Sequence, residues 1–239
     1  MTVPRLHVTE RLEAGQGLRI VGDRAHYLRN VLRLRAGASL QMFSALDGEW
    51  RATVASVDRH ALEIAVEERL RPPAVEPGPT LVFAPIRRNR LDWLIEKAVE
   101  LGVARLVPVL TQRTVVRPEG SARLEAIAVE AAEQCERLSV PTIAPPRPLA
   151  AWLAAREPLT PLLFADERGE GAPLGRALQG IGEADMLEGP EGGFAPEERA
   201  ALLAAAGAAP VSLGARILRA ETAAVYMLAA WQLAQQNDP

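Results

Sequence analysis

Alternating apolar and polar positions dominate the first part of the chain and predict short β-strands. The expected strands cover Leu18–Val21, Ser39–Phe43, Trp50–Val57 and Ala61–Val66. Asp47-Gly48 is a turn signal between two of them. One helical stretch interrupts this pattern, with Leu28, Val31 and Leu32 expected on one face. Several short strands with a single helix indicate a small β-barrel.

A different pattern begins at Thr80–Ala84, which reads as a buried strand. A helix follows, with an apolar face formed by Leu91, Leu94, Ile95, Ala98 and Leu101. Gly102 is its expected C-terminal cap. Val103–Val109 then returns as an apolar strand. This is a βαβ unit, which predicts a parallel sheet.

The alternation of helix and strand continues to the end of the chain. We expect helices at Ser121–Arg137, around Leu174, from Pro196 and from about Glu221, and strands at Leu162–Ala165, Met186-Leu187 and Val211–Leu213. The proline-rich segment between the two patterns suits a stiff linker. The predicted organisation is a β-barrel domain over residues 1–71, a linker over 72–79 and an α/β domain over 80–239.

Composition narrows the classes of protein that fit. No apolar run approaches the roughly 20 residues that span a bilayer, and the N-terminus lacks an apolar signal segment. One cysteine excludes an internal disulfide, and three scattered histidines predict no metal site. We therefore expect a cytoplasmic protein without metal or membrane contacts.

Charge gives only weak support for a nucleic-acid partner. The formal net charge is −3, whereas nucleic-acid-binding proteins usually carry a basic excess. Lys97 is the only lysine among the 27 basic residues. A GC-rich genome explains this bias, and the superior phosphate binding of arginine is a second explanation. Any RNA contact must rest on a local basic patch.

The strongest local signal is the glycine-rich segment Gly189–Glu198, between a predicted strand and a helix. Pro196 suits a first helical turn, and Glu197 and Glu198 favour the positive end of the helix dipole. Ligands bind at such strand ends in open α/β sheets. No phosphate-loop or dinucleotide fingerprint is present, and carboxylates in the loop would repel a polyphosphate. A purely structural turn is the alternative interpretation.

A second signal follows the last predicted strand, where Ser212–Ala224 carries a glycine, two arginines and the acidic start of a helix. Arg216, Arg219 and Glu221 are placed at a strand's carboxyl end. Because this loop and the glycine-rich loop both follow strands, we expect them to share a pocket. In the alternative interpretation, Arg216 and Arg219 form a solvated face, and Glu221 only complements the dipole of the helix that it begins.

Two weaker signals are polar clusters on predicted helices. Arg29 and Arg33 are spaced i,i+4 opposite the apolar face of the first helix, where they can hold phosphates. The segment Ala131–Arg137 ends a helix before Val140-Pro141. Cys135 within it is interpreted as a packed residue, since no histidine lies nearby in the sequence. A solvated face explains either cluster equally well.

Taken together, these motifs make the chain resemble the RsmE family of 16S ribosomal RNA uridine-N3 methyltransferases over nearly its whole length. The resemblance rests on His26, Val31-Leu32-Arg33, Arg90–Trp93, Glu96-Lys97, Glu100–Val103, Glu133–Cys135, Arg137, Val140-Pro141, Gly189–Gly193, Leu213-Gly214, Ile217–Arg219 and Glu221–Ala223. It implies a PUA-like RNA-binding barrel before a SPOUT-type parallel sheet with a C-terminal trefoil knot. It also implies a homodimer that binds S-adenosylmethionine (SAM) and acts on the small ribosomal subunit.

The resemblance assigns the site residues as follows. Cofactor contacts are expected from Leu163, Phe164, Gly189, Pro190, Glu191, Gly192, Gly193, Leu213, Gly214, Ile217, Leu218, Thr222 and Ala223. Arg219 is the hypothesis for stabilising negative charge on the uracil, with Glu221 orienting it. RNA contact is assigned to His26, Arg29, Arg33 and Arg87.

Two departures and three rival interpretations accompany this assignment. Glu188 stands where the family usually has an apolar strand residue, and Arg87 and Arg88 stand where it often has a lysine. One rival is a ribose 2′-O methyltransferase of the same knotted class, whose last helix typically opens with an asparagine motif rather than Arg219–Thr222. The others are a non-catalytic RNA-binding assembly factor and an ordinary dinucleotide enzyme.

Overall fold

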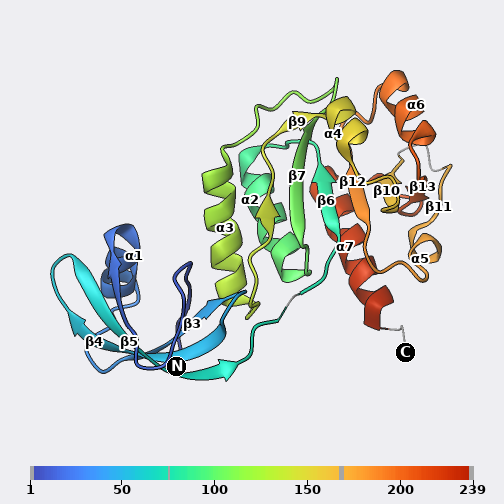
Figure 1. Ribbon diagram of the computed structural model, residues 1–239. Coiled ribbons are helices and arrows are strands. Elements are labelled where there is room, and N and C mark those ends of the chain that lie inside the picture. The colour runs from blue at the N-terminus through green and yellow to red at the C-terminus, as the bar shows by residue number, and fades with distance from the viewer. Residues whose placement is uncertain (1–2, 75, 167–169, 237–239) are drawn as a thin grey trace. The chain divides into compact units, whose positions relative to one another are not determined.

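The computed structural model describes residues 3–74, 76–166 and 170–236, and these form two compact units. One unit comprises the N-terminal residues up to Val75 together with Ala132–Val140; the other comprises the rest of the chain. Each is built around its own sheet (Figure 1). Val75, in the predicted linker, lies outside the described residues, and the described residues between Arg71 and Thr80 adopt no helix or strand.

The first unit is a strongly curved five-stranded sheet, a half-barrel, in the order β1-β3-β4-β5-β2 (Figure 1). Its strands are β1 (Arg5–His7), β2 (Gly17–Val21), β3 (Ser39–Ser44), β4 (Gly48–Val57) and β5 (Ala61–Arg71). β1 pairs with β3 in parallel and the other pairs are antiparallel. The predicted small β-barrel is therefore observed as a half-barrel, whose sheet has β1 and β2 as its two edges.

The predicted helix of this unit is shorter and less regular than the sequence pattern suggests. A helix α1 (Gly22–His26) continues as a π-helical turn over Tyr27–Val31. Leu28 is buried as expected, but Val31 is exposed. The prediction of Val31 on the apolar face was wrong because a π turn rotates successive side chains by a smaller angle than an α turn.

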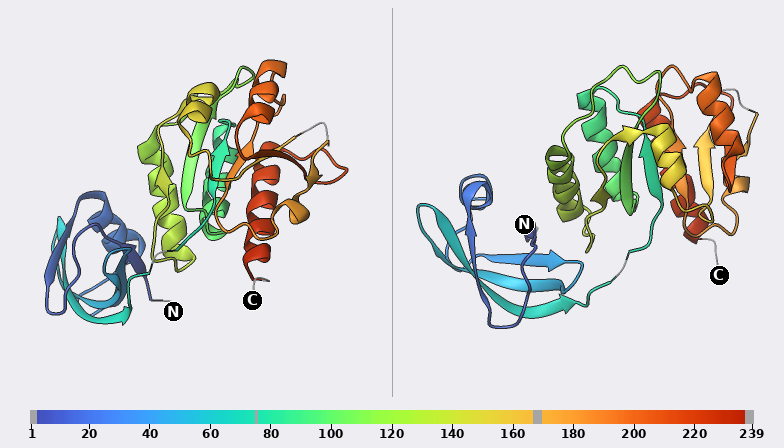
Figure 2. Two further views of the ribbon diagram at one scale, coloured as in Figure 1. Left: turned by 45° about the vertical axis from the view of Figure 1, so that its right-hand side comes forward. Right: turned by 45° about the horizontal axis from the view of Figure 1, so that its top comes forward.

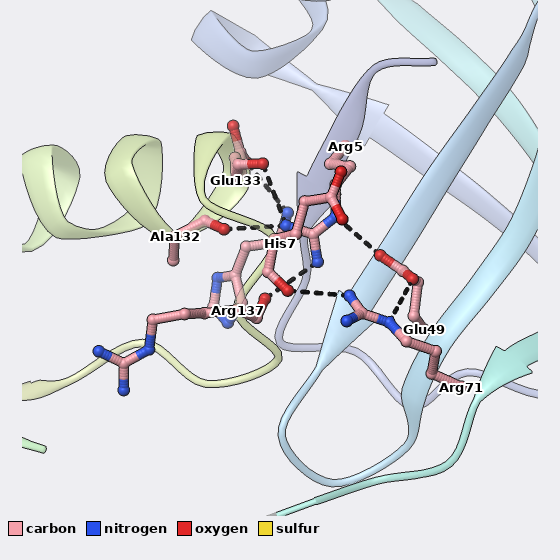
Figure 3. Close-up of polar contacts among 8 residues, drawn as sticks. Arg5, His7, Glu49, Arg71, Ala132, Glu133 and Arg137 are labelled. Atoms are coloured by element: carbon pink, nitrogen blue, oxygen red, sulfur yellow. Dashed lines mark hydrogen bonds and ion pairs between the residues drawn. The ribbon is translucent and has the colours of Figure 1, made fainter. Parts of the chain in front are cut away.

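A network of hydrogen bonds and ion pairs joins strands β1, β4 and β5 of the first unit (Figure 3). Glu49 on β4 accepts hydrogen bonds from Arg5 Nε and Arg71 Nε, each at 2.7 Å. Arg5 also donates to the carbonyl groups of Ala132, Glu133 and Arg137 at 2.9–3.0 Å. These carbonyls lie at the end of helix α3 (Ser121–Gln134). The Arg5 side chain from β1 thus satisfies carbonyl groups at this end of the helix that would otherwise lack a hydrogen-bond donor.

The second unit is a sheet in the order β11-β13-β10-β12-β6-β7-β8 whose strands all pair in parallel. Its strands are β6 (Thr80–Phe83), β7 (Arg105–Leu110), β8 (Thr142–Ile143), β10 (Leu162–Ala165), β11 (Ala172–Pro173), β12 (Asp185–Glu188) and β13 (Ala208–Ser212). A short strand, β9 (Arg147–Pro148), pairs with β7. The predicted parallel α/β sheet is confirmed.

Helices flank this sheet on both faces (Figure 2). They are α2 (Arg88–Glu100), α4 (Leu149–Ala155), α5 (Leu174–Ala177), α6 (Pro196–Ala204) and α7 (Ala220–Gln236), in addition to α3. Trp152 of α4 and Leu202 of α6 pack with Leu187 and Phe164 in one core. α2 packs on α7, which also contacts β12. Since side chains alternate along a strand, Glu188 faces the α2–α7 side, opposite Leu187.

Local sequence signals explain most of these boundaries. Gly102 follows α2 with φ +84°, the left-handed conformation that glycine adopts without a steric penalty. Pro196 opens α6. The sequence patterns missed β1, β8, β9, β11 and α4, because segments of two or three residues show no periodicity and α4 follows directly on prolines.

Candidate active site

Three loops meet at one edge of the parallel sheet. They follow β10, β12 and β13, which are neighbours in the sheet, so their carboxyl ends lie side by side. Together they line a cavity of about 790 Å³, a volume typical of small-ligand sites. Its walls are formed by Ala165, Asp166, Glu188, Gly189, Pro190, Glu191, Gly192, Gly193, Phe194, Ser212, Leu213, Gly214, Ala215, Arg216, Ile217, Leu218, Ala220 and Ala223.

Most of the predicted cofactor residues come together in this cavity. The whole segment Gly189–Gly193 lines it, together with Leu213, Gly214, Ile217, Leu218 and Ala223. Leu163 and Phe164 do not, because they lie inside β10; the strand end that reaches the cavity is Ala165-Asp166. Thr222 is exposed on α7 outside the lining. Neighbouring residues of a strand or helix point to different faces. The motif alone therefore could not show which of its residues reach the cavity.

Two arginines from elsewhere in the chain hold the glycine-rich loop in place. Arg90 on α2 forms an ion pair with Glu191, and Arg113 Nη1 donates to the Gly192 carbonyl at 2.6 Å. Neither arginine was predicted as a site residue. Their segments are far from the loop in the sequence. Arg90 stands in a motif of the family resemblance that carried no site assignment, and no local pattern distinguishes Arg113 from a solvated arginine.

The helix that follows the loop is anchored by a single carboxylate. Glu198 Oε2 accepts a hydrogen bond from the Ala195 amide at 3.0 Å, which satisfies a free donor at the start of α6. Its other oxygen accepts from the Gln112 amide at 2.8 Å. The predicted helix start at Pro196 therefore also fixes the loop to the segment after β7.

The second loop presents its backbone to the cavity. Within the part of the chain that the structure describes, no amide of residues 215–218 donates a hydrogen bond. The Ile217 side chain is fully exposed. Unfulfilled amides beside a cavity are potential donors to a ligand.

Glu221 and Arg219, the predicted catalytic pair, have different surroundings. Arg219 is exposed immediately before α7. Glu221 is buried in the first turn of α7, and its Oε1 lies 3.5 Å from Arg90 Nε. Among the described residues, Glu221 contacts Arg90 rather than Arg219. Arg90 thereby connects the glycine-rich loop to α7.

Two buried carboxyl groups line the cavity, and they differ in whether an arginine pairs with them. Asp166 is paired with Arg199, whose Nη2 lies 2.7 Å from Oδ2. Glu188 has no such partner: its Oε2 is buried without a hydrogen bond in the described structure. Burial, and then the negative charges of Glu221 and Glu191, raise the pKa of Glu188 well above the usual glutamate range.

The predicted RNA-binding residues belong to both compact units. His26, Arg29 and Arg33 lie in the first unit and Arg87 precedes α2 in the second. Arg29 and Arg33 do not share a regular helix as predicted. The helical turn ends at Val31, and Arg33 has a left-handed backbone with φ +56°. The Arg29 guanidinium donates to the carbonyls of Asp58 and Arg59, so its charge is not paired with a carboxylate there.

The described residues offer neither a membrane-spanning helix nor a cluster of metal ligands. No helix among residues 3–74, 76–166 and 170–236 is long and apolar enough to cross a bilayer. The same residues contain no group of three or more potential metal ligands among histidine, cysteine, aspartate and glutamate.

Comparison with known proteins relates both units to enzymes that modify RNA. A family model described as "RNA methyltransferase domain" matches residues 76–232, and one described as "RNA methyltransferase PUA domain" matches residues 20–67. The ribosomal RNA small subunit methyltransferase E of Rickettsia conorii is 31% identical over 96% of this chain and 95% of its own length.

Solved structures give the same result. The ribosomal RNA small subunit methyltransferase E of Neisseria gonorrhoeae, bound to S-adenosyl methionine, superposes with a TM-score of 0.87 at 29% identity, covering 97% of each chain. A putative methyltransferase of Legionella pneumophila in complex with the cofactor SAM has a TM-score of 0.86 at 26% identity, covering 98% of each chain.

Proposed function

The chain belongs to the ribosomal RNA small subunit methyltransferase E family, and we propose that it transfers a methyl group from SAM to N3 of a uridine in 16S ribosomal RNA. The observation that carries this proposal is the cavity at the carboxyl ends of β10, β12 and β13, which the residues of the family resemblance line. The uridine-N3 specificity rests on the resemblance of the whole chain to that family.

The residues of the cavity fit a ligand such as SAM. A volume of about 790 Å³ accommodates a nucleoside with an amino-acid chain. The amides of residues 215–218 supply donors, and the carboxyl groups of Glu188 and Glu191 suit a ligand that carries positive charge. A polyphosphate would meet these carboxyl groups unfavourably, which disfavours a dinucleotide enzyme.

The reaction requires more than a bound cofactor. SAM supplies an electrophilic methyl group when bound. The N3 of uracil carries a proton at neutral pH, so this proton must leave and the uracil oxygens must be stabilised as negative charge develops. Arg219 is our candidate for that stabilisation, since it is exposed and joins the cavity loop to α7 in the chain. Glu221 is proposed to hold the start of α7 through Arg90.

Gly189 is expected to be essential for the shape of the cavity. A methyl group added at Gly189 would lie 2.8 Å from the ring of Phe194, which is buried in the core between the sheet and α6. Gly189→Ala should therefore displace the glycine-rich loop and weaken SAM binding by at least about tenfold, or 1.4 kcal/mol. Isothermal titration calorimetry measures this loss.

Gly175→Ala is a matched control, because a methyl group at Gly175 meets no atom within 4 Å and its backbone angle is not left-handed. The control should bind SAM as the unmodified protein does. Equal affinity of Gly189→Ala and Gly175→Ala would contradict the assignment of this loop.

RNA contact is proposed for His26, Arg29, Arg33 and Arg87. Alanine at both Arg29 and Arg33 should weaken RNA binding and reduce the slope of log affinity against log salt by about 1.5, because two phosphate contacts are lost. Filter binding or fluorescence anisotropy at several salt concentrations measures the slope. Arg51→Ala is the control, since Arg51 is exposed on β4 and already paired with Glu68. An unchanged slope in the double variant would show that the two arginines do not contact RNA phosphates.

Three further properties are proposed on the family resemblance. They are a homodimeric state, a trefoil knot in the C-terminal part of the α/β domain and a cytoplasmic location. The last is supported by the substrate, since ribosomal subunits are assembled in the bacterial cytoplasm. We also propose the domain boundaries 1–71, 72–79 and 80–239, to which the two family matches at residues 20–67 and 76–232 lend support.

The proposed reaction is tested with labelled SAM and small ribosomal subunits that lack the native modification. Nucleoside mass spectrometry of the product RNA should identify 3-methyluridine. Methylation of the ribose would favour the 2′-O methyltransferase instead. Absence of any product, with SAM binding confirmed by calorimetry, would favour a non-catalytic RNA-binding factor.

A further inference from the structure

Glu188 is a buried acid in the wall of the cofactor cavity. It is the last residue of β12 and only 6% exposed. In the described structure its carboxyl group takes part in no hydrogen bond or ion pair, and its Oε2 is buried. Burying a carboxyl group without a partner is costly, so such a group is unusual in a structural role.

Glu221 is a second acid on the same side of the sheet. It begins α7, which packs against β12. Its Oε1 is 3.5 Å from Arg90 Nε, and its Oε2 is buried without a hydrogen bond in the described structure. The two buried oxygens without a hydrogen bond therefore come from elements that contact each other, and Glu188 also lines the cavity.

The charges around Glu188 are unbalanced. Arg90 on α2 forms ion pairs with both Glu221 and Glu191, so one guanidinium serves two carboxylates before Glu188 is counted. Asp166 at the end of β10 is already matched by Arg199. Arg216 lines the cavity from the opposite loop but is exposed. A positive charge placed in this cavity would offset the excess negative charge of these acidic side chains.

This imbalance acts on the proton of Glu188. Burial, and then the negative charges of Glu221 and Glu191, raise its pKa and so favour the neutral acid over the carboxylate. A cation in the cavity would have the opposite effect and favour the carboxylate. Inside a protein such an interaction acts over several ångströms, because the effective dielectric constant is lower than in water.

We propose that Glu188, together with Glu221, recognises the positive charge of the sulfonium group, so that the cavity binds SAM in preference to S-adenosylhomocysteine. The two ligands differ at this sulfur: it is a cation in SAM and a neutral thioether in S-adenosylhomocysteine. This inference rests on the proposed function of the cavity. It gives the product of methyl transfer a lower affinity than the donor and so favours product exchange.

The proposal requires a proton to move. Before binding, no partner among the described residues stabilises the charge of the buried Glu188 carboxyl group, which favours its neutral form. When SAM binds, Glu188 releases its proton to the solvent and becomes a carboxylate, so that ligand cation and side-chain anion neutralise each other. S-adenosylhomocysteine brings no sulfonium charge, so Glu188 keeps its proton. SAM binding should therefore release a proton that S-adenosylhomocysteine binding does not.

Isothermal titration calorimetry of the full chain tests both consequences. Titrations in buffers of different ionisation enthalpy give the number of protons released by SAM and by S-adenosylhomocysteine. The ratio of the two affinities comes from the same titrations. Four proteins are compared: the unmodified chain, Glu188→Gln, Glu188→Leu and Glu197→Gln. The last removes one carboxylate from the exposed first turn of α6, outside the cavity lining.

Glu188→Gln should lower the preference for SAM over S-adenosylhomocysteine by about tenfold and abolish the difference in proton release. Glu197→Gln should leave both unchanged. Glu188→Leu is a second variant that removes the polar group altogether, and it should unfold at a higher temperature because an unpartnered buried acid is removed. Its preference for SAM should be lost in the same way.

Equal ligand preference and equal proton release in the unmodified chain and in Glu188→Gln would overturn the inference and leave the proposed function intact. Failure of the unmodified chain to bind SAM at all would overturn both. Loss of affinity for the two ligands by the same factor would also overturn the inference, since it would indicate a general effect on the cavity.

Discussion

Arg219→Ala is expected to lower kcat for methyl transfer to ribosomal RNA by roughly 100- to 1,000-fold, the usual effect of removing one donor that stabilises developing negative charge. Because Arg219 is exposed and lies outside the lining of the cofactor cavity, the affinity for SAM should change by no more than a few fold. Single-turnover methylation of unmodified small subunits measures the first quantity, and calorimetry with SAM measures the second.

Two further variants separate charge from packing. Arg219→Lys keeps the positive charge without the planar guanidinium and should recover only part of the rate. Arg216→Ala removes an arginine from the same loop that does line the cavity, so it should affect SAM binding more than Arg219→Ala does. Unchanged turnover in Arg219→Ala would remove this residue from the catalytic assignment.

Glu49→Ala is expected to destabilise the N-terminal unit by about 3–5 kcal/mol, the typical cost of breaking a buried ion pair. The carboxylate is only 6% exposed and receives hydrogen bonds from Arg5 and Arg71 (Figure 3). Without it, the Arg5 charge is left buried, with a side chain 5% exposed and no carboxylate partner among the described residues, only carbonyl groups and the Phe43 ring. Urea unfolding of the full chain measures the change in stability.

Hydrogen exchange measured by mass spectrometry gives the location of this effect. Arg5 bonds the carbonyls of Ala132, Glu133 and Arg137, so the end of α3 should exchange faster in the variant. Glu68→Ala is the matched control, because the Arg51–Glu68 pair in the same unit is more than half exposed on both sides and should contribute less than about 1 kcal/mol. Equal stability of the two variants would contradict the prediction.

The same carboxylate gives the unit a defined response to acid. Burial by itself would raise the pKa of Glu49, but the hydrogen bonds from Arg71 and Arg5 outweigh it, and the pKa is lowered. The stabilising contribution is therefore fully present above the ordinary glutamate pKa and is lost as the pH falls through the lower value of the folded state. Glu49→Gln should lack this component of the acid transition.

The sequence predicted the elements of both units wherever a pattern extended over several residues. Strands β2 to β5 of the half-barrel, the strands β6, β10 and β12, and the helices α2, α6 and α7 follow from alternation, helical periodicity and the glycine and proline residues at their ends. The shared cavity was also predicted, because two motifs followed strands that had to be parallel, and the carboxyl ends of parallel strands meet at one edge.

Irregular backbone was not predictable in the same way. The helix near Leu28 ends in a π turn before Arg33. The i,i+4 spacing of Arg29 and Arg33 therefore does not place them on one face of a regular helix. Periodicity assumes one regular helix, and a single wide turn shifts every later side chain. Similarly, Leu163 and Phe164 belong to the buried part of β10 although their motif adjoins the cavity.

Local sequence patterns were enough to predict which longer segments form strands and helices, and which motifs follow parallel strands. The pairing of distant charged groups depends on the folded chain: Arg5 pairs with Glu49 and bonds the end of α3, and Arg90 pairs with Glu191 and Glu221. Local propensity depends on neighbouring residues, whereas a buried charge depends on every group that folding brings within a few ångströms. The unpartnered carboxyl of Glu188 is visible only at that level.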